Sequence, residues 1–357
     1  MTNSIFRFRS LAIAVLCSMF FSLVLLSCKK DEVLIILVNR SCLTENVTAA
    51  DALYYGTDEG TIPGQYVIGS KADLKTALDA ALLVLADSSS TSADVTNACA
   101  QLEAAIAAYQ ANINQEILPE NLIGFWKLDG NPADSSGHGN NGVVTTGHAF
   151  FGAGIPMAIP DRFGRANMAY HFDKGGNIEV PYTSSLNPAQ MTISLWCKKD
   201  TAGRTVNKDT YTLLSLNRWN GYKYQWQSTN RPFYTVHAVN GSDTVYYDKD
   251  DNLSLDNEIW YHIAVSFTSG QEVFYVNGLK VQTWTDVPGI PVMVPSTVNF
   301  VIGQDLPTSY YLTVDPTGNR LVDYGGFWTG DMDDVMFYNT VLSDQQVSSI
   351  YESQKNP

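Results

Sequence analysis

The amino-acid composition of the chain changes abruptly near residue 118. Residues 71–110 contain 12 alanines and no glycine, whereas all seven tryptophans and 22 of the 26 glycines come after residue 118. A glycine-free, alanine-rich stretch is typical of packed helices, and frequent glycines among aromatic residues are typical of short strands joined by turns. We therefore expect a small all-α part, residues 28–118, and an all-β part, residues 119–357, after a leader of residues 1–27.

The leader has the pattern of a secretion signal. Arg7 and Arg9 precede an apolar stretch, Leu11 to Leu26, whose length of about 16 residues is short for a membrane-spanning helix. The sequence Leu25-Leu26-Ser27-Cys28 resembles the lipobox of bacterial lipoproteins. This resemblance implies cleavage before Cys28 and lipidation of Cys28. An uncleaved membrane anchor is the alternative.

The net negative charge of the chain limits the classes of ligand that it can bind. There are 36 acidic and 22 basic residues, and cleavage before Cys28, which removes two arginines, takes the net charge from −14 to −16. Nucleic-acid binders need clustered cations that contact phosphates, so we exclude that class and expect an extracellular glycan or a divalent cation instead. Residues 29–32, Lys-Lys-Asp-Glu, resemble the export tag of surface-displayed lipoproteins. The resemblance implies an outer-membrane protein that is held by its lipid and faces the cell exterior.

Apolar residues in the all-α part recur at spacings of three and four, which lines one face of a helix. We expect a third helix over roughly residues 32–55, and hence a three-helix bundle. The chain from residue 56 onward, with the two helices that follow, resembles the FIVAR-like helical modules of cell-surface proteins, which implies a spacer or an interaction unit. The two stripes consist of Leu74, Leu78, Ala81 and Leu85, and of Val95, Cys99, Leu102, Ile106, Tyr109 and Ile113.

Two cysteines of this bundle are expected at similar positions along the helix axes. If the first and third helices run parallel, Cys42 and Cys99 are offset by only ~4 Å along the helix axes at ~1.5 Å per residue. A Cys42–Cys99 disulfide is therefore compatible with the bundle. Two free buried thiols are the alternative.

The all-β part shows the alternation of half-buried strands. Its clearest hairpin covers residues 272–283, where Asn277-Gly278 suits a type I′ turn because both residues accept positive φ. This register pairs Val276 with Leu279 and Phe274 with Val281. Many strands, frequent turns and one short closing helix favour two packed sheets.

The all-β part contains seven motifs that occur in a fixed order, at residues 125–129, 134–142, 169–173, 191–196, 260–265, 275–278 and 330–338. This order resembles that of a laminin G-like (concanavalin A-like) jelly-roll domain. The resemblance implies a curved sandwich that often binds carbohydrate or protein and often holds one Ca²⁺.

Catalysis by this fold would need a pair of carboxyl groups. Retaining glycoside hydrolases place two carboxyls roughly 5–5.5 Å apart, and hydrolases of this fold usually carry Glu-x-Asp-x-x-Glu on one strand. The nearest segment here is Asp331-Met-Asp333-Asp334, in which both Glu positions are missing. We therefore expect no catalysis. The alternative is a glycoside hydrolase that acts on the O-glycosyl bonds of a polysaccharide through Asp331, Asp333 and Asp334.

A structural calcium site is a further expectation. If the first and last strands of the jelly roll pair antiparallel, their acids approach each other near the loop that follows the first strand. Several oxygens converging at ~2.4 Å would suit Ca²⁺, although the same side chains can instead cap turns. The candidate ligands are Asp129, Asp134, Asn140, Asp331 and Asp333.

Aromatic rings are the candidate sugar-binding groups, because flat rings stack on the apolar faces of sugars. Tyr222, Tyr224 and Trp226 share one face of a strand, and that face is either core or ligand surface, with Lys223, Gln225 and Gln227 on the opposite face. Trp219 lies in a polar loop beside this strand. A second group of rings, in long loops, consists of Tyr310, Tyr311 and Trp328.

These expectations combine into one function: a cell-surface lipoprotein whose helical module spaces out a jelly-roll domain that binds a glycan without cleaving it. The alternatives are the glycoside hydrolase and a protein-adhesion module.

Overall fold

The computed structural model describes residues 38–201, 210–227, 229–311 and 326–357. The leader, with Cys28, lies outside these residues. The chain divides into two compact units, Met1–Asn39 and Arg40–Pro357, and the second contains all the elements below. No helix in the described ranges has the length and hydropathy that a bilayer crossing requires.

Three α-helices open the second unit: α1 (Ser41–Gly56), α2 (Ser70–Ala86) and α3 (Ser92–Ala111). Helix α3 starts with the expected capping box, because Thr91 accepts from the Asp94 amide and Asp94 accepts from the Thr91 amide. Helix α1 begins at Ser41, and the described residues before it are not helical, contrary to the expected start near residue 32. The Arg40 guanidinium instead donates to backbone carbonyls at the end of α2, where the helix dipole favours a cation.

The helices pack along the expected stripes. Leu43, Leu74, Leu78 and Leu102 are almost fully buried. A disulfide joins Cys42 of α1 to Cys99 of α3, with their Cα atoms 6.2 Å apart.

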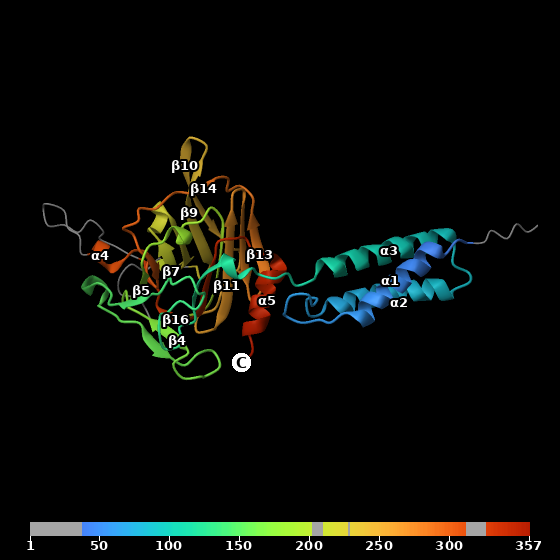
Figure 1. Ribbon diagram of the computed structural model, residues 1–357, viewed down its shortest axis with the longest axis horizontal. Coiled ribbons are helices and arrows are strands. Elements are labelled where there is room, and N and C mark those ends of the chain that lie inside the picture. Colours follow the sequence, from blue (N-terminus) through green and yellow to red (C-terminus); the bar gives the residue numbers. More distant parts are fainter. Residues whose placement is uncertain (1–37, 202–209, 228, 312–325) are drawn as a thin grey trace, which may run out of the picture. The chain divides into compact units, whose positions relative to one another are not determined.

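Two eight-stranded antiparallel sheets form a jelly-roll sandwich after residue 121 (Figure 1). The first sheet has the order β13-β12-β11-β6-β16-β4-β3, with β1 paired to β16. Its strands are β1 (Leu122–Trp126), β3 (Met157–Ile159), β4 (Ala169–Phe172), β6 (Met191–Lys199), β11 (Tyr261–Thr268), β12 (Gln271–Val276), β13 (Leu279–Trp284) and β16 (Gly330–Tyr338).

The second sheet has the order β10-β9-β8-β7-β15-β5-β2, with β14 paired to β9. Its strands are β2 (Val143–Thr145), β5 (Asn177–Val180), β7 (Thr210–Leu216), β8 (Tyr222–Gln227), β9 (Pro232–Asn240), β10 (Asp243–Asp250), β14 (Ile290–Pro291) and β15 (Phe300–Ile302).

The main core lies between the sheets and takes its side chains from alternate positions of both, such as Ile193, Ile263, Tyr234 and Phe300. A smaller apolar cluster covers the other side of the first sheet. There Val347 and Ile350 of α5 (Asp344–Gln354) pack on side chains such as Tyr275. Helix α5 thus docks on the sandwich, as expected from its sequence.

The 272–283 hairpin confirms the expected turn and corrects the expected register. Asn277 and Gly278 have φ values of 49° and 75°, and Val276 pairs with Leu279. Phe274 pairs with Gln282 rather than with Val281, because a β-bulge lies between this pair and the Tyr275–Lys280 pair. The extra residue, Val281, packs against the main core.

Candidate functional site

Most of the rings expected to bind sugar lie inside the protein. Tyr222, Tyr224 and Trp226 of β8 are fully buried in the main core. Trp328 is buried as well and packs edge to face on Trp226, with ring centroids 5.6 Å apart. Tyr311 is also fully buried, near Phe151. These five predictions were wrong. The three β8 rings and Trp328 fill the space between the sheets, and Tyr311 belongs to a smaller apolar cluster.

Trp219 and Tyr310 are the two expected rings that stay partly exposed. Trp219 belongs to the 3₁₀ turn Arg218–Asn220, between β7 and β8. Its ring lies 4.2 Å from the Arg218 guanidinium carbon and 5.8 Å from the Lys223 ammonium nitrogen. Trp219 therefore lies beside Lys223, whose side chain points away from the main core.

Next to Trp219 lies the side of strands β7 to β10 that points away from the main core, which we call the polar face. Most of its side chains, such as those of Thr212, Gln225 and Thr235, are themselves buried. In one cross-strand row the register aligns Ser215, Lys223, Thr235 and Asp248. Neighbouring rows contain Thr212 with Gln225, and His237 with Tyr246. The polar face thus consists of Thr212, Ser215, Lys223, Gln225, Thr235, His237, Tyr246 and Asp248.

At one end of the polar face two aromatic rings stack. The His237 and Tyr246 rings are nearly parallel, with centroids 4.0 Å apart. Tyr246 is 48% exposed, and its hydroxyl donates to Asn220 Oδ1 at 3.3 Å. This hydrogen bond links β10 to the turn that carries Trp219. An indole, a phenol ring, an amide and an ammonium group are therefore found at the same end of the face.

Several buried polar atoms of this face have no hydrogen-bond partner within the described residues. They are the Gln225 Oε1 atom, the Thr212 hydroxyl and both imidazole nitrogens of His237. Buried polar atoms normally find a partner in the protein, in water or in a ligand.

The charges of the face are only partly paired. Arg218 Nε donates to Asp305 Oδ2 at 2.7 Å, and Thr235 donates to Asp248 Oδ1 at 2.6 Å. Lys223 has no carboxylate within salt-bridge distance in the parts of the chain that are described. Burial lowers the pKa of Lys223, and the Asp305 and Asp248 carboxylates oppose that change.

The three acids of the alternative hydrolase site lie on β16, where each already has a basic partner. Asp331 Oδ2 accepts from Lys198 at 2.6 Å. Arg162 binds both Asp333 and, at 2.9 Å, Asp334. Burial raises the pKa of Asp333 and of Asp334, and Arg162 opposes this rise. A raised pKa suits a general acid, but the Asp333 carboxyl is covered by Arg162 and cannot reach a substrate.

A serine–histidine pair, which could in principle activate a nucleophile, is also buried. Ser194 Oγ lies 2.8 Å from His262 Nε2, and both residues are buried in the first sheet. Burial lowers the pKa of His262 to about 3, so its ring is neutral. Their depth makes this pair a structural hydrogen bond.

The calcium site stays a prediction, although four of its five expected ligands have other partners. Asp134 accepts hydrogen bonds from the amides of Phe125, Ser136 and Asn140, so it caps the loop after β1. The Asn140 amide group donates to the Ile123 carbonyl oxygen. Asp331 and Asp333 are held by the basic groups described above. Separate partners among the described residues therefore hold Asp134, Asn140, Asp331 and Asp333.

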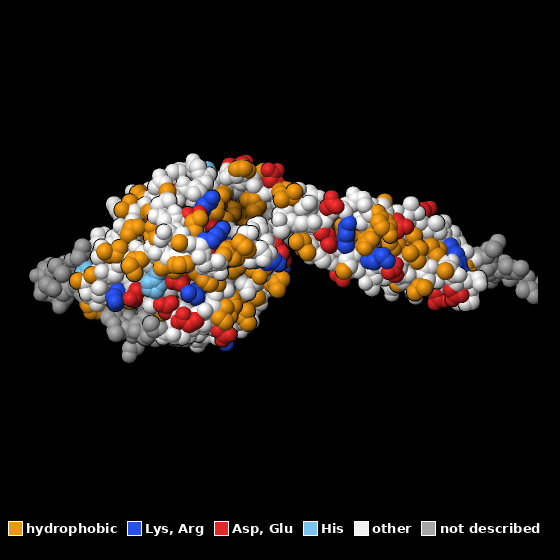
Figure 2. Space-filling model, turned by 90° about the horizontal axis from the view of Figure 1, so that it is seen from below, with side chains coloured by type: hydrophobic (Ala, Val, Ile, Leu, Met, Phe, Trp, Pro, Cys, Tyr) orange, Lys and Arg blue, Asp and Glu red, His pale blue; other side chains and the backbone are white. Residues whose placement is uncertain are grey.

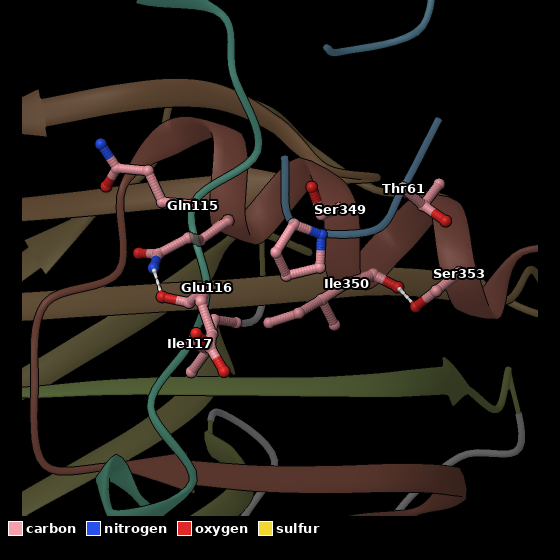
Figure 3. A pocket seen from close by; sticks show the side chains of 9 residues that line it. Thr61, Gln115, Glu116, Ile117, Ser349, Ile350 and Ser353 are labelled. Atoms are coloured by element: carbon pink, nitrogen blue, oxygen red, sulfur yellow. Dashed lines mark hydrogen bonds between the residues drawn. The ribbon is translucent and has the colours of Figure 1, made fainter. Parts of the chain in front are cut away.

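A pocket of about 330 Å³ lies between the 61–63 loop, residues 115–117 and α5 (Figure 3). Gln346 Nε2 of α5 donates to the Glu116 carbonyl oxygen at its edge. The lining contains aliphatic and short polar side chains and one carboxylate, Glu116, and it contains no aromatic ring. The pocket is therefore a poorer sugar site than the polar face.

Comparison with known proteins identifies the sandwich. Residues 172–348 match the family model of the Concanavalin A-like lectin/glucanases superfamily. This segment is a concanavalin A-like domain. No curated protein matches the chain.

Several solved structures are similar to the part of the chain that contains this concanavalin A-like domain. Domain 4 of AbnA, a GH43 extracellular arabinanase from Geobacillus stearothermophilus, solved with arabinotriose, is 18% identical, with a TM-score of 0.45, and covers 65% of this chain and 98% of its own. The receptor-binding domain of botulinum neurotoxin C/D mosaic serotype is 16% identical, with a TM-score of 0.46 and coverage of 66% and 52%. The serotype D domain, in complex with N-acetylneuraminic acid, is 17% identical, with a TM-score of 0.43 and coverage of 66% and 52%. This chain therefore spans about half of the two neurotoxin chains.

Sequence reasoning found only part of the polar face of the concanavalin A-like domain. It placed Lys223 and Gln225 opposite the β8 aromatics, but it missed His237 and Tyr246. The signal that could have found them is the alternation along β9 and β10, which turns every second residue away from the core.

Proposed function

We propose that the concanavalin A-like domain binds a carbohydrate at the polar face and does not cleave it. The observation that carries the proposal is the grouping of Trp219 and Tyr246, two partly exposed rings, around the Lys223 ammonium group and the Asn220 amide. Rings stack on the C–H faces of sugars, and amide and ammonium groups bind the hydroxyls between those faces.

The unpartnered atoms of the polar face support the same proposal. An unsatisfied buried acceptor costs roughly 1–3 kcal/mol. A water between the sugar and the face can donate to Gln225 Oε1 and can either donate to or accept from the His237 ring. Carbohydrate binding with such a water would therefore supply partners that the described residues do not supply.

The non-catalytic part of the proposal rests on the acids. Retaining cleavage needs a nucleophile and an acid that face the same bond. Asp331, Asp333 and Asp334 are each bound by a basic side chain, and the polar face belongs to the other sheet.

We further propose that the protein is a lipid-anchored surface protein, on the basis of the lipobox-like sequence that ends at Cys28. Its partner would then be an extracellular glycan, and its contact with the membrane would run through acyl chains alone. The helical part would serve as a spacer. Labelling cells with a radioactive fatty acid tests the anchor, and a Cys28→Ala chain should remain unlabelled and uncleaved.

The glycan proposal is tested by a glycan array together with a reducing-end assay on the bound sugar. Wild-type protein should bind and release no new reducing ends. Trp219→Ala and Tyr246→Ala should each weaken binding at least tenfold. Tyr55→Ala, which removes a 76% exposed ring from α1, is the matched control and should bind like wild type. Equal binding by all four proteins would exclude the polar face.

A protein-adhesion role is the second candidate, because the helical part exposes large apolar side chains. Figure 2 shows apolar side chains on the face of this part that is in view. Tyr55, Ile62, Ile68 and Leu83 are each more than half exposed. If adhesion to a host or neighbouring cell is the function, Tyr55→Ala combined with Leu83→Ser should abolish it, whereas Trp219→Ala should not.

A further inference from the structure

Three metal-ligating side chains come together at one edge of the first sheet. They are His171 on β4, Asp200 directly after β6, and Asp331 on β16, and one ligand atom from each lies within 4.8 Å of the other two. The strand register explains the meeting. Asp331 is aligned with His171 on one side and with Lys198 on the other. The Asp200 amide donates to the Thr329 carbonyl oxygen at 3.1 Å, which fixes Asp200 beside the start of β16.

The two carboxylates of this cluster differ in their partners. His171 Nδ1 lies 2.8 Å from Asp331 Oδ1, and Lys198 Nζ lies 2.6 Å from Asp331 Oδ2. The Asp200 carboxylate is half-buried near these groups and has no hydrogen bond or ion pair with any described residue. Asp200 is therefore free to act as a ligand.

A second group next to the cluster also lacks a partner. The Thr329 hydroxyl is buried, with the residue only 4% exposed, and makes no hydrogen bond within the described ranges. Thr329 lies two residues before Asp331, and its carbonyl oxygen accepts a hydrogen bond from the Asp200 amide. Buried hydroxyl groups normally have a partner in the protein, in water or in a ligand. A water held at the cluster would supply one.

We propose that His171, Asp200 and Asp331 bind a divalent transition-metal ion of the Zn²⁺ type. Imidazole nitrogens and carboxylate oxygens are both ligands of Zn²⁺, which takes four ligands in a tetrahedron. A water in the fourth position would hydrogen-bond to the Thr329 hydroxyl. The imidazole ligand disfavours Ca²⁺ and Mg²⁺, which prefer oxygen ligands.

Binding needs small side-chain movements and leaves the backbone in place. The hydrogen bond between His171 Nδ1 and Asp331 Oδ1 would break, and both atoms would bind the metal ion instead. Lys198 keeps its contact with Asp331 Oδ2 and orients that carboxylate from outside the metal shell. The Asp200 carboxylate, which has no other partner, completes the protein ligands. The ion would then join β4, β16 and the end of β6, so its effect is to stabilise this edge of the sheet.

The test is a Zn²⁺ titration of the full-length protein by isothermal titration calorimetry, with the unfolding midpoint measured on the same samples. Asp200→Asn is the decisive variant, because Asp200 has no partner whose loss would disturb the apo fold. His171→Ala is the second variant. His138→Ala removes an exposed histidine outside the cluster, and Asp173→Asn removes a partly exposed acid close to it, so these two are the matched controls.

The expected result is one Zn²⁺ per chain, a raised unfolding midpoint in the presence of Zn²⁺, and at least tenfold weaker binding by Asp200→Asn and His171→Ala, but not by the controls. Co²⁺ in place of Zn²⁺ should give the visible absorption bands of a four-coordinate site in wild type and not in Asp200→Asn. The proposal is overturned if wild type shows no saturable binding, or if Asp200→Asn binds Zn²⁺ as tightly as wild type does. Tighter binding of Ca²⁺ than of Zn²⁺ would overturn the assignment of the ion.

Discussion

Arg162 covers Asp333 with its guanidinium group, and both side chains are almost fully buried. The same group donates to Asp334 Oδ2 at 2.9 Å and to the Gln354 carbonyl oxygen of α5 at 2.9 Å. Its carbon also lies 4.4 Å from the centre of the Trp196 ring. Arg162 thus binds two acids of β16 with a single positive charge and joins them to the closing helix, which explains why these acids are not free to act on a substrate.

Replacing Arg162 with alanine should destabilise the sandwich. The change leaves two carboxyl groups buried without their cation, and such losses cost about 3–5 kcal/mol. Urea unfolding followed by tryptophan fluorescence measures the effect. Lys280→Ala is the control, because the Lys280–Asp344 ion pair is about half exposed and should contribute less than ~1 kcal/mol. The double variant Arg162→Ala/Asp333→Asn should recover part of the loss, and a loss no larger than that of Lys280→Ala would contradict the assignment.

The two tryptophans near β8 should behave in opposite ways. Trp226→Ala empties a fully buried position of the core and should cost about 3–5 kcal/mol of unfolding free energy. Trp219→Ala removes a partly exposed ring and should change stability by less than ~1 kcal/mol, while weakening glycan binding. Urea unfolding and array binding of both variants separate the two roles. A large loss of stability in Trp219→Ala would show that this ring is structural.

Asp251 should make the protein more stable in mild acid than at pH 8. Burial raises the pKa of Asp251 to about 7 from 3.8, because only one of its oxygens is hydrogen-bonded, by the Leu253 amide. Between these pH values the folded state holds a proton that the unfolded chain has released. The stabilisation is therefore complete below about pH 4 and is lost as the pH rises through 7, by at most about 4 kcal/mol.

The measurement for Asp251 is the difference in unfolding free energy between wild type and Asp251→Asn at several pH values from 4 to 8. Asparagine cannot titrate, so this difference should shift towards the variant as the pH rises. The comparison removes the contribution of other buried acids, such as Glu272, whose pKa burial also raises. A constant difference over this range would rule out a proton on Asp251.

The Cys42–Cys99 disulfide should stabilise the helical part in particular. It closes a loop with a sequence separation of 57, for which chain entropy predicts about 4 kcal/mol. Reduction, or the double variant Cys42→Ala/Cys99→Ala, should lower the midpoint of helix unfolding followed by far-ultraviolet circular dichroism. Tryptophan fluorescence should hardly change, because every tryptophan follows residue 118. Equal shifts in both signals would mean that the two parts unfold together.

The local features of the fold were predictable because neighbouring residues determine them. Asn277-Gly278 accepts positive φ at both positions, and Thr91 with Asp94 caps a helix through groups three residues apart. The alternation of β8 was equally clear, but alternation separates two faces without saying which one is buried. Whether Tyr222, Tyr224 and Trp226 form core or a ligand surface therefore stayed open, and the structure places them in the core.

The groups that depend on strand register could not be derived in this way. His171, Asp200 and Asp331 are distant in the sequence and meet only because β16 lies between β4 and β6. The expected calcium ligands likewise depend on which strands and loops meet. The pairing of β1 with β16 was correct, but the loop after β1 uses Asp134 to bind its own amides.

The central claim is that the polar face binds a carbohydrate and that the domain does not cleave it. The most direct measurement is an array of extracellular polysaccharides on which bound protein and new reducing ends are quantified together, for wild type, Trp219→Ala and Asp333→Ala. The account predicts binding without new reducing ends by wild type, and binding that is lost with Trp219→Ala. New reducing ends that appear with wild type and disappear with Asp333→Ala would contradict it.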